Sequence, residues 1–307
     1  MLARGCAPAG AQKKALTRAH SHKRRISILG PRARRASKAL AHRSPVYRKA
    51  ALYIRTVEED GYFDERVAAV YDHYKNDPTR SEFAEEDINS TVAFLARLAG
   101  EGRALEFGVG TGRIALPLAQ RGIRTVGIDL SRPMVARLRA KPGGEDINVS
   151  IGDFAATSVE GSFSLVYLIC NTIMNLTTQK AQVACFRNAA AHLNAGGRFV
   201  IKVMVPELQR LPPGETLHVF AASEEHWGID EYDIANQGLI SHHFDKFDGR
   251  LERSSVPFRY VWPSELDLMA ELAGMRLCER WEGWNREPFT SESRKHVSVW
   301  EKPGCSS

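Results

Sequence analysis

The sequence has little cysteine and no long apolar run. Its 307 residues hold an odd, unevenly spaced set of five cysteines with no CxxC pair, at Cys6, Cys170, Cys185, Cys278 and Cys305. Such a set indicates neither a disulfide framework nor a zinc site, so a reducing cytoplasm is the expected compartment. The longest clean apolar runs hold about six residues, whereas a membrane-spanning helix needs about 20. We therefore expect no membrane partner and no bound metal.

Acidic side chains are absent from residues 1–57, which contain fifteen Lys or Arg. The rest of the chain holds 27 basic and 36 acidic side chains, so the net charge of +6 hides an acidic body. An acidic body argues against nucleic acid as a partner of the folded part. Residues 1–57 show little sustained apolar pattern and cannot bury enough surface to offset their ordering entropy. We expect a disordered basic leader at 1–57 and a folded domain at 58–303.

Several roles are open for this leader. Lys23-Arg24-Arg25 is followed by a short apolar stretch and then by Gly30-Pro31, so the apolar region of a signal peptide is missing. The Arg- and Ser-rich composition fits a mitochondrial transit peptide better. A basic arm that binds RNA or anionic lipid, a solvated tail, and translated sequence upstream of a true start are the alternatives.

Strand and helix patterns alternate through the middle of the chain. Apolar residues at helical spacing first predict helices at 64–74 and 81–98. Alternating elements follow, with strands at 104–107, 124–128, 147–151, 163–169 and 198–205, and helices at 112–120, 131–140 and 178–193. Ser81 and Ser131 are the expected N-caps of their helices. This alternation is typical of βαβ units, which form a parallel sheet with helices on both faces.

The chain departs from this alternation after the strand at 198–205. Asp248-Gly249 lies between apolar segments and predicts a β-hairpin within an insert at 206–262. A further helix is expected at 263–273, and two last strands at 275–283 and 295–301. The predicted fold class is therefore α/β, with a seven-stranded, mostly parallel sheet, an N-terminal helical cap and an inserted hairpin lid.

A glycine-rich loop follows the strand at 104–107 and opens the next helix, with the sequence Leu105-Glu106-Phe107-Gly108-Val109-Gly110-Thr111-Gly112. Glycines allow a tight turn and let a ligand approach the backbone. Asp129, at the end of the second strand, can accept hydrogen bonds from two vicinal ribose hydroxyls. Together they indicate a nucleotide-type cofactor. The alternative is that the glycines serve helix–strand packing and Asp129 is an exposed helix cap.

The spacing of the glycines separates two such cofactors. NAD needs G-x-G-x-x-G, with a helix N-terminus facing the pyrophosphate, whereas Gly108, Gly110 and Gly112 follow G-x-G-x-G. Glu106 lies two residues before the first glycine. Its carboxylate would repel a pyrophosphate but would attract the amino group of a cofactor that carries one. S-adenosylmethionine has such an ammonium group and no phosphate.

The segment from Glu106 to Gly112 resembles motif I of the class I S-adenosylmethionine-dependent methyltransferases, E-x-G-x-G-x-G. Residues 127–134 resemble their second motif, and residues 152–154 the acid and apolar pair that holds adenine. Residues 193–199 resemble the stretch before the fifth strand, with Ala195 in place of the usual proline. The resemblance covers about residues 64–303 and implies a Rossmann-like sheet. It is specific for the superfamily and not for a substrate.

The resemblance also assigns roles to single residues. It implies that the methionine end of the cofactor contacts Glu106, Gly108, Gly110, Cys170 and Asn171, and that Gly112 also belongs to the cofactor site. It places the ribose on Asp129, and the adenine on Leu130, Asp153 and Phe154. Tyr71 lies on a helix that covers the cofactor in many relatives. Core packing is the alternative for Tyr71 and Cys170, and a turn acid is the alternative for Asp153.

The acceptor is expected to be a small molecule. Nucleic-acid amino methyltransferases of the superfamily carry (N/D/S)-P-P-(Y/F) after the fourth strand, but residues 170–175 read Cys-Asn-Thr-Ile-Met-Asn. The insert at 206–262 resembles the lid of small-molecule N- and O-methyltransferases, including sugar N-methyltransferases. Its candidate catalytic residues are His242, His243 and Tyr260. The two histidines are adjacent on an expected strand, so at most one of them faces the pocket.

These observations predict methyl transfer to an N or O atom of a small molecule. Two other functions are compatible with the motifs. One is a methyltransferase-like protein that binds the cofactor without turnover, since a fold does not determine a function. The other is an NAD-dependent Rossmann oxidoreductase, which the glycine spacing disfavours.

Overall fold

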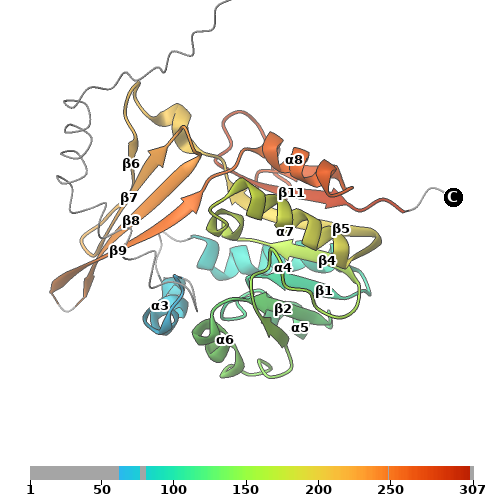
Figure 1. Cartoon of the computed structure of the whole chain (residues 1–307). Coiled ribbons are helices and arrows are strands. Elements are labelled where there is room, and N and C mark those ends of the chain that lie inside the picture. The colour runs from blue at the N-terminus through green and yellow to red at the C-terminus, as the bar shows by residue number, and fades with distance from the viewer. Residues whose placement is uncertain (1–61, 77–80, 248, 305–307) are drawn as a thin grey trace, which may run out of the picture. The chain divides into compact units, whose positions relative to one another are not determined.

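Seven strands form the central sheet, in the spatial order β10-β11-β5-β4-β1-β2-β3 (Figure 1). The computed structural model describes residues 62–76, 81–247 and 249–304, which belong to one compact unit, Val57–Ser307. The predicted leader at 1–57 lies outside the described residues. The strands are β1 (Ala104–Phe107), β2 (Thr125–Asp129), β3 (Asn148–Ile151), β4 (Phe163–Leu168), β5 (Leu193–Met204), β10 (Arg276–Trp281) and β11 (Lys295–Glu301).

Strands β1 to β5 pair in parallel, and β11 pairs antiparallel with both β5 and β10. Parallel strands of this kind are covered on both faces and carry continuous apolar runs. All four residues of β1 are accordingly buried, as are five of the six residues of β4. The predicted α/β class with a seven-stranded, mostly parallel sheet is confirmed.

Helices cover both faces of this sheet (Figure 1). Val166 and Leu168 of β4 belong to an apolar cluster that includes residues of α7 and α8, whereas Leu165 and Tyr167 belong to a cluster with residues of α4 and α5. Residues that alternate along one strand therefore supply two separate cores. The helices are α3 (Glu65–Val70), α4 (Glu85–Ala99), α5 (Ala115–Gln120), α6 (Arg132–Arg139), α7 (Gln179–His192) and α8 (Pro263–Leu272).

Local capping explains where several helices begin. Ser131 accepts a hydrogen bond from the backbone N–H of Met134 and caps α6, as predicted. The helix expected from Ser81 begins instead at Glu85, because Ser81–Phe83 form a 3₁₀ turn. The helix expected at 64–74 is likewise divided into α3 and a 3₁₀ helix at Tyr71–Asn76.

The insert after β5 forms a four-stranded antiparallel sheet. Strands β8 (Gly238–Phe247) and β9 (Arg250–Arg259) pair as the predicted hairpin. Two further strands, β6 (Leu217–Ala222) and β7 (His226–Asp233), extend it. The insert therefore contains the predicted hairpin and two further strands that the sequence analysis did not predict. Most side chains of β6 and β7 are exposed or half-buried, so their sequences lack the clear apolar alternation that identifies a strand.

A buried ion pair joins this second sheet to the helices of the main domain. Arg259, at the end of β9, pairs with Glu265 of α8 at 2.7 Å, and its guanidinium also donates to the side chain of Gln182 on α7. Gln237 donates to the other oxygen of Glu265 at 2.8 Å. The charges are thus compensated inside the protein, which a buried pair requires.

We predict that Glu265→Ala lowers the free energy of unfolding by about 3 kcal/mol, because it leaves the Arg259 charge buried without its partner. Glu271→Ala, at an exposed position of the same helix, should change it by less than about 0.5 kcal/mol. Urea unfolding of both variants measures the difference. Equal losses in the two variants would contradict a structural role for the ion pair.

Candidate functional site

The glycine-rich loop lies at the carboxyl end of β1, where ligands bind in open α/β sheets. Gly108, Gly110 and Gly112 all have positive φ, at 72°, 54° and 77°. A Cβ atom on Gly108 would lie only 2.8 Å from Cγ2 of Thr172, beyond the end of β4. Glycine is therefore required at this position both for the backbone conformation and for the close approach of the β4 end.

Asp129 binds the loop directly from the end of β2. Its Oδ2 accepts a hydrogen bond from the Gly110 N–H at 2.6 Å, and its Oδ1 accepts one from the Ser131 N–H at 2.8 Å. Burial raises the pKa of Asp129, and these backbone hydrogen bonds oppose the rise. Because a carboxylate has about four acceptor sites, Asp129 keeps capacity for further donors. The exposed helix cap considered above is excluded, since Ser131 caps α6 and Asp129 is buried.

Glu106 lies at the end of β1, just before the loop, and is buried. The phenol of Tyr167 on β4 donates to its Oε2 at 2.9 Å. Burial raises the pKa of Glu106 to about 8, although the Tyr167 hydrogen bond and the charge of Arg113 act in the other direction. The site therefore contains a carboxyl group that is mostly protonated at neutral pH.

A pocket lies over the loop, and five of the predicted cofactor residues line it. They are Tyr71, Glu106, Gly108, Gly110 and Cys170. Gly112 is not part of this lining. It packs closely against α6 instead, where a Cβ atom on it would lie only 2.9 Å from Cγ of Leu138. The structure thus brings together residues from the N-terminal cap, the glycine-rich loop and the end of β4.

The N-terminal cap is fastened to this loop by side chains that carry no sequence motif. Thr111 donates to Asp72 at 2.7 Å, and Lys141 pairs with Asp72 at 2.8 Å while it donates to the Thr111 carbonyl. Ser131 donates to the carbonyl of Phe63. Sequence analysis missed Asp72 and Lys141, since neither residue type nor spacing distinguishes them from ordinary surface charges.

Arg113 is a third residue that sequence analysis missed, although it directly follows the glycines. Its Nη2 donates to the Cys170 Sγ at 2.6 Å, its Nη1 donates to the Glu82 carbonyl, and its guanidinium lies 4.2 Å from the ring centroid of Phe83. Burial raises the pKa of the Tyr71 phenol to about 12, and Arg113 opposes this rise. Arg113 thus links the cap, the loop and β4.

The end of β4 carries two strained residues. Cys170 and Asn171 have φ values of 56° and 62°, a left-handed conformation that side-chain-bearing residues rarely adopt. Asn171 is stabilised there because its Oδ1 accepts from the Met204 N–H at 2.8 Å. Burial raises the pKa of the Cys170 thiol, with Arg113 acting against it. Cys170 is therefore a neutral thiol at the pocket wall.

The residues expected around adenine lie outside this pocket lining. Asp153 is exposed, and its Oδ1 accepts from the Ala155 N–H at 2.8 Å. Phe154 is buried and stacks on Phe107, with ring centroids 5.8 Å apart. Leu130 is 41% exposed beside Asp129, which leaves apolar surface open there. Their contact with a cofactor stays a prediction.

The three candidate catalytic residues also lie outside the pocket lining. His242 bonds to Ser255 at 2.8 Å and to Glu231 at 3.1 Å on β9 and β7. His243 contacts Phe220 on the opposite face of the same sheet. Tyr260 is 1% exposed and packs against the Tyr232 ring. Each of these contacts is also compatible with a purely structural role. The catalytic role of the three residues stays a prediction.

No group of three or more His, Cys, Asp or Glu in residues 62–76, 81–247 and 249–304 could hold a metal ion. Within the same ranges, no helix is both long and apolar enough to cross a membrane.

Comparisons with known proteins agree with this geometry. The methyltransferase domain family matches residues 104–197. The structure is similar to that of the CcbJ methyltransferase from Streptomyces caelestis, with a TM-score of 0.71 and 34% identity over 80% of this chain and 100% of that chain. The sequence is 27% identical to cypemycin N-terminal methyltransferase from a Streptomyces species, over 64% of this chain and 82% of that protein.

A fold likeness extends to a protein solved with the cofactor bound. It is CalS10, an amino pentose methyltransferase from Micromonospora echinaspora, with a TM-score of 0.56 and 19% identity over 80% of this chain and 99% of that chain. These findings confirm S-adenosylmethionine as the cofactor in place of NAD. The chain belongs to the class I S-adenosylmethionine-dependent methyltransferases.

Proposed function

We propose that this methyltransferase acts on the amine nitrogen of a small molecule. The lining of the pocket carries this proposal: among its described residues Glu106 is the only carboxylate, and there is no histidine. A neutral amine is already a nucleophile, whereas an alcohol needs a base to remove its proton. If Glu106 binds the cofactor, no carboxylate or histidine of the described lining is left to act as a base. Such a pocket suits an amine acceptor, which needs none.

The buried groups of the site fit the chemistry of S-adenosylmethionine. Glu106 is a buried carboxyl whose raised pKa shows that it lacks a full cationic partner, and an ammonium group supplies one. Asp129 has acceptor sites left for ribose hydroxyls. The exposed Leu130 gives adenine an apolar surface, and Asp153 lies at the same edge of the sheet. We assign these four residues to cofactor binding, together with the glycines of the loop.

The sulfonium of the cofactor supplies an activated methyl group, so the protein acts mainly by alignment, worth up to about 7–11 kcal/mol in favourable cases. The acceptor nitrogen forms the new bond with its lone pair as the carbon–sulfur bond breaks and its electron pair goes to sulfur. The methylated nitrogen then loses its proton to water. Tyr71, Cys170 and Thr172 would orient the two reactants over the loop.

The acceptor region is proposed to include the insert at 206–262, within a catalytic unit spanning 58–303. The names of relatives support an amine acceptor, because one is an N-terminal methyltransferase and others are described as an amino pentose methyltransferase and a sugar N-methyltransferase. The insert is too long for a plain connection between a strand and a helix, which usually takes about 2–6 residues. His242, His243 and Tyr260 remain its candidates for acceptor contact.

The proposal predicts that the full-length protein transfers a ¹³C-methyl group from S-adenosylmethionine to nitrogen in a fractionated pool of small metabolites. A matched pool, in which the amines have been blocked by selective acylation, should accept no label. Mass spectrometry and NMR identify the methylated atom. Equal labelling of the blocked pool would indicate an oxygen acceptor, and cofactor binding with no labelled product would indicate a protein without turnover.

We also predict that cofactor binding releases a proton from Glu106. Its pKa is about 8 in the free site, so the carboxyl is mostly protonated at pH 7, and a neighbouring ammonium favours its ionised form. Affinity for S-adenosylhomocysteine, which carries the same amino acid end, should therefore rise almost tenfold per pH unit below about 8. At higher pH the ligand's own α-amino group loses its charge, and affinity falls.

Calorimetry in buffers of different ionisation enthalpy counts these protons. The wild-type protein should release nearly one proton at pH 7, and Glu106→Gln should release almost none and lose the rising limb of the pH profile. An aspartate substitution outside the site, such as Asp146→Asn at an exposed position, should leave the proton count unchanged. A wild-type profile that is flat between pH 6 and 8 would remove Glu106 from the ammonium site.

Asp129→Ala should weaken cofactor binding by about 1–3 kcal/mol, because ribose hydroxyls would be left without an acceptor in a buried site. Asp87→Ala is the matched control, since Asp87 pairs with Lys202 and does not contact the loop. Calorimetry with S-adenosylhomocysteine measures both affinities. If Asp129→Ala bound the ligand as tightly as the wild-type protein, Asp129 would serve only to hold Gly110 and Ser131.

A further inference from the structure

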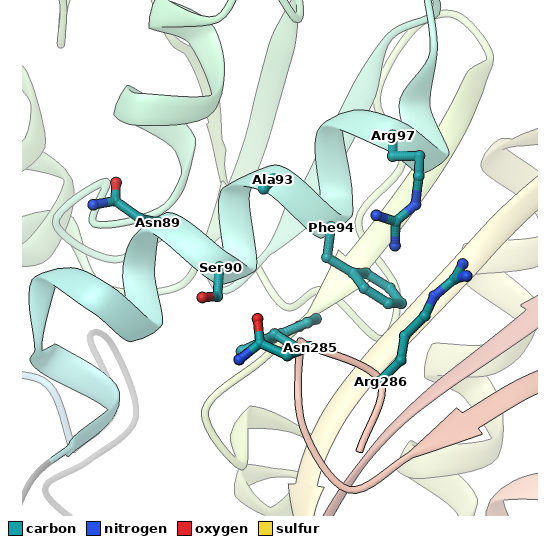
Figure 2. Close-up of a pocket in the computed structure, with 8 residues that line it drawn as sticks. Asn89, Ser90, Ala93, Phe94, Arg97, Asn285 and Arg286 are labelled. Atoms are coloured by element: carbon teal, nitrogen blue, oxygen red, sulfur yellow. The ribbon is translucent and has the colours of Figure 1, made fainter. Parts of the chain in front are cut away.

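A surface groove of about 430 Å³ lies between α4 and the loop that joins β10 to β11 (Figure 2). Asn89, Ser90 and Arg97 line it from one face of α4, and Asn285 and Arg286 line it from the loop. None of these residues lines the cofactor pocket. The groove is therefore a second site, with a volume in the range of about 300–1,000 Å³ that is common for small-molecule sites.

Two arginines converge at one end of this groove. Figure 2 shows the guanidinium groups of Arg97 and Arg286, which come from the two different elements, on the same side of it. Arg97 lies 5.0 Å from the ring centroid of Phe94, and Arg286 lies 5.7 Å from that of Trp281. Contact with an aromatic ring restrains an arginine side chain, so less freedom is lost when a ligand binds.

The charge of Arg97 is not compensated within the described part of the chain. Arg286 pairs with Glu279 at 3.2 Å, but no carboxylate in the described part of the chain lies within 4.0 Å of the Arg97 guanidinium. The lining itself has no acidic residue, and its other polar groups are the amides of Asn89 and Asn285 and the hydroxyl of Ser90. The groove thus offers one excess positive charge and several neutral hydrogen-bonding groups.

The floor of the groove is rigid. Phe94 is 1% exposed and Trp284 is 5% exposed, and their ring centroids lie 5.4 Å apart. Lys202 lies 5.4 Å from the Trp284 ring and pairs with Asp87 at 2.9 Å, which ties this floor to β5 and α4. Arg286 has a φ of 66°, a strained conformation that the surrounding loop maintains.

We infer that this groove binds a small organic molecule through its phosphate monoester. The terminal oxygens of a phosphate monoester can accept hydrogen bonds from both guanidinium groups, whose planar donors bind phosphate oxygens in pairs, and Arg97 supplies the uncompensated positive charge. The groove is larger than a phosphate ion, and its amides and hydroxyl suit the polar groups of the organic part.

The test compares ribose 5-phosphate, inorganic phosphate and ribose as probes, by calorimetry on the full-length protein at 150 mM salt. The basic leader attracts anions without specificity, so the readout is the difference between variants that all carry it. Ribose 5-phosphate should bind saturably, and Arg97→Ala and Arg286→Ala should each weaken it at least tenfold. Arg276→Ala is the matched control, because Arg276 is exposed, pairs with Glu301 and does not line the groove.

Arg97→Lys refines the test, since it keeps the charge but loses the planar donors, and it should recover only part of the affinity. Binding that is equal in the wild-type protein and the two alanine variants would overturn the inference, because it would belong to the leader. Inorganic phosphate that binds as tightly as ribose 5-phosphate would also overturn it, since the organic part would then make no contact.

Discussion

The hydrogen bonds from the backbone of Gly110 and Ser131 to Asp129 are the interaction on which the rest of the site depends. They join the glycine-rich loop, which follows β1, to the end of the neighbouring strand β2, at the edge of the sheet where we propose that the cofactor binds. Thr111 and Lys141 then hold Asp72 of the cap against the same loop. The N-terminal cap and the end of β2 are thus both hydrogen-bonded to the same loop, at Gly110 and Thr111. A displacement of Asp129 would therefore disturb the loop and, through Thr111, its contact with the cap.

The buried carboxyl of Glu106 adds an electrostatic constraint to this geometric one. A group with a pKa near 8 is costly to ionise in the empty protein. In the binding mode that we propose, the ammonium group of the cofactor lies beside Glu106 and offsets this cost, whereas a pyrophosphate would add to it. Glu106 is therefore our proposed physical reason for the preference for S-adenosylmethionine over NAD that the glycine spacing first indicated.

The main sheet could be predicted because its strands are buried on both faces and its turns carry glycine, so each element has a strong local pattern. The glycine-rich loop and Asp129 could be predicted because their spacing follows from that sheet. Asp72, Lys141 and Arg113 could not, since their contacts join residues far apart in the chain and no local pattern marks them. Strands β6 and β7 were missed because their partly exposed side chains hide the alternation that would identify them.

The position of β11 has a consequence for how the chain folds during synthesis. This strand lies between β5 and β10 and pairs with both, although it is the last strand in the sequence. Until residues 295–301 leave the ribosome, β5 presents an unpaired edge and β10 has no partner in the sheet. An open strand edge is a template on which partly folded chains pair with one another, so the insertion of β11 is the step that removes this aggregation-prone edge from the sheet.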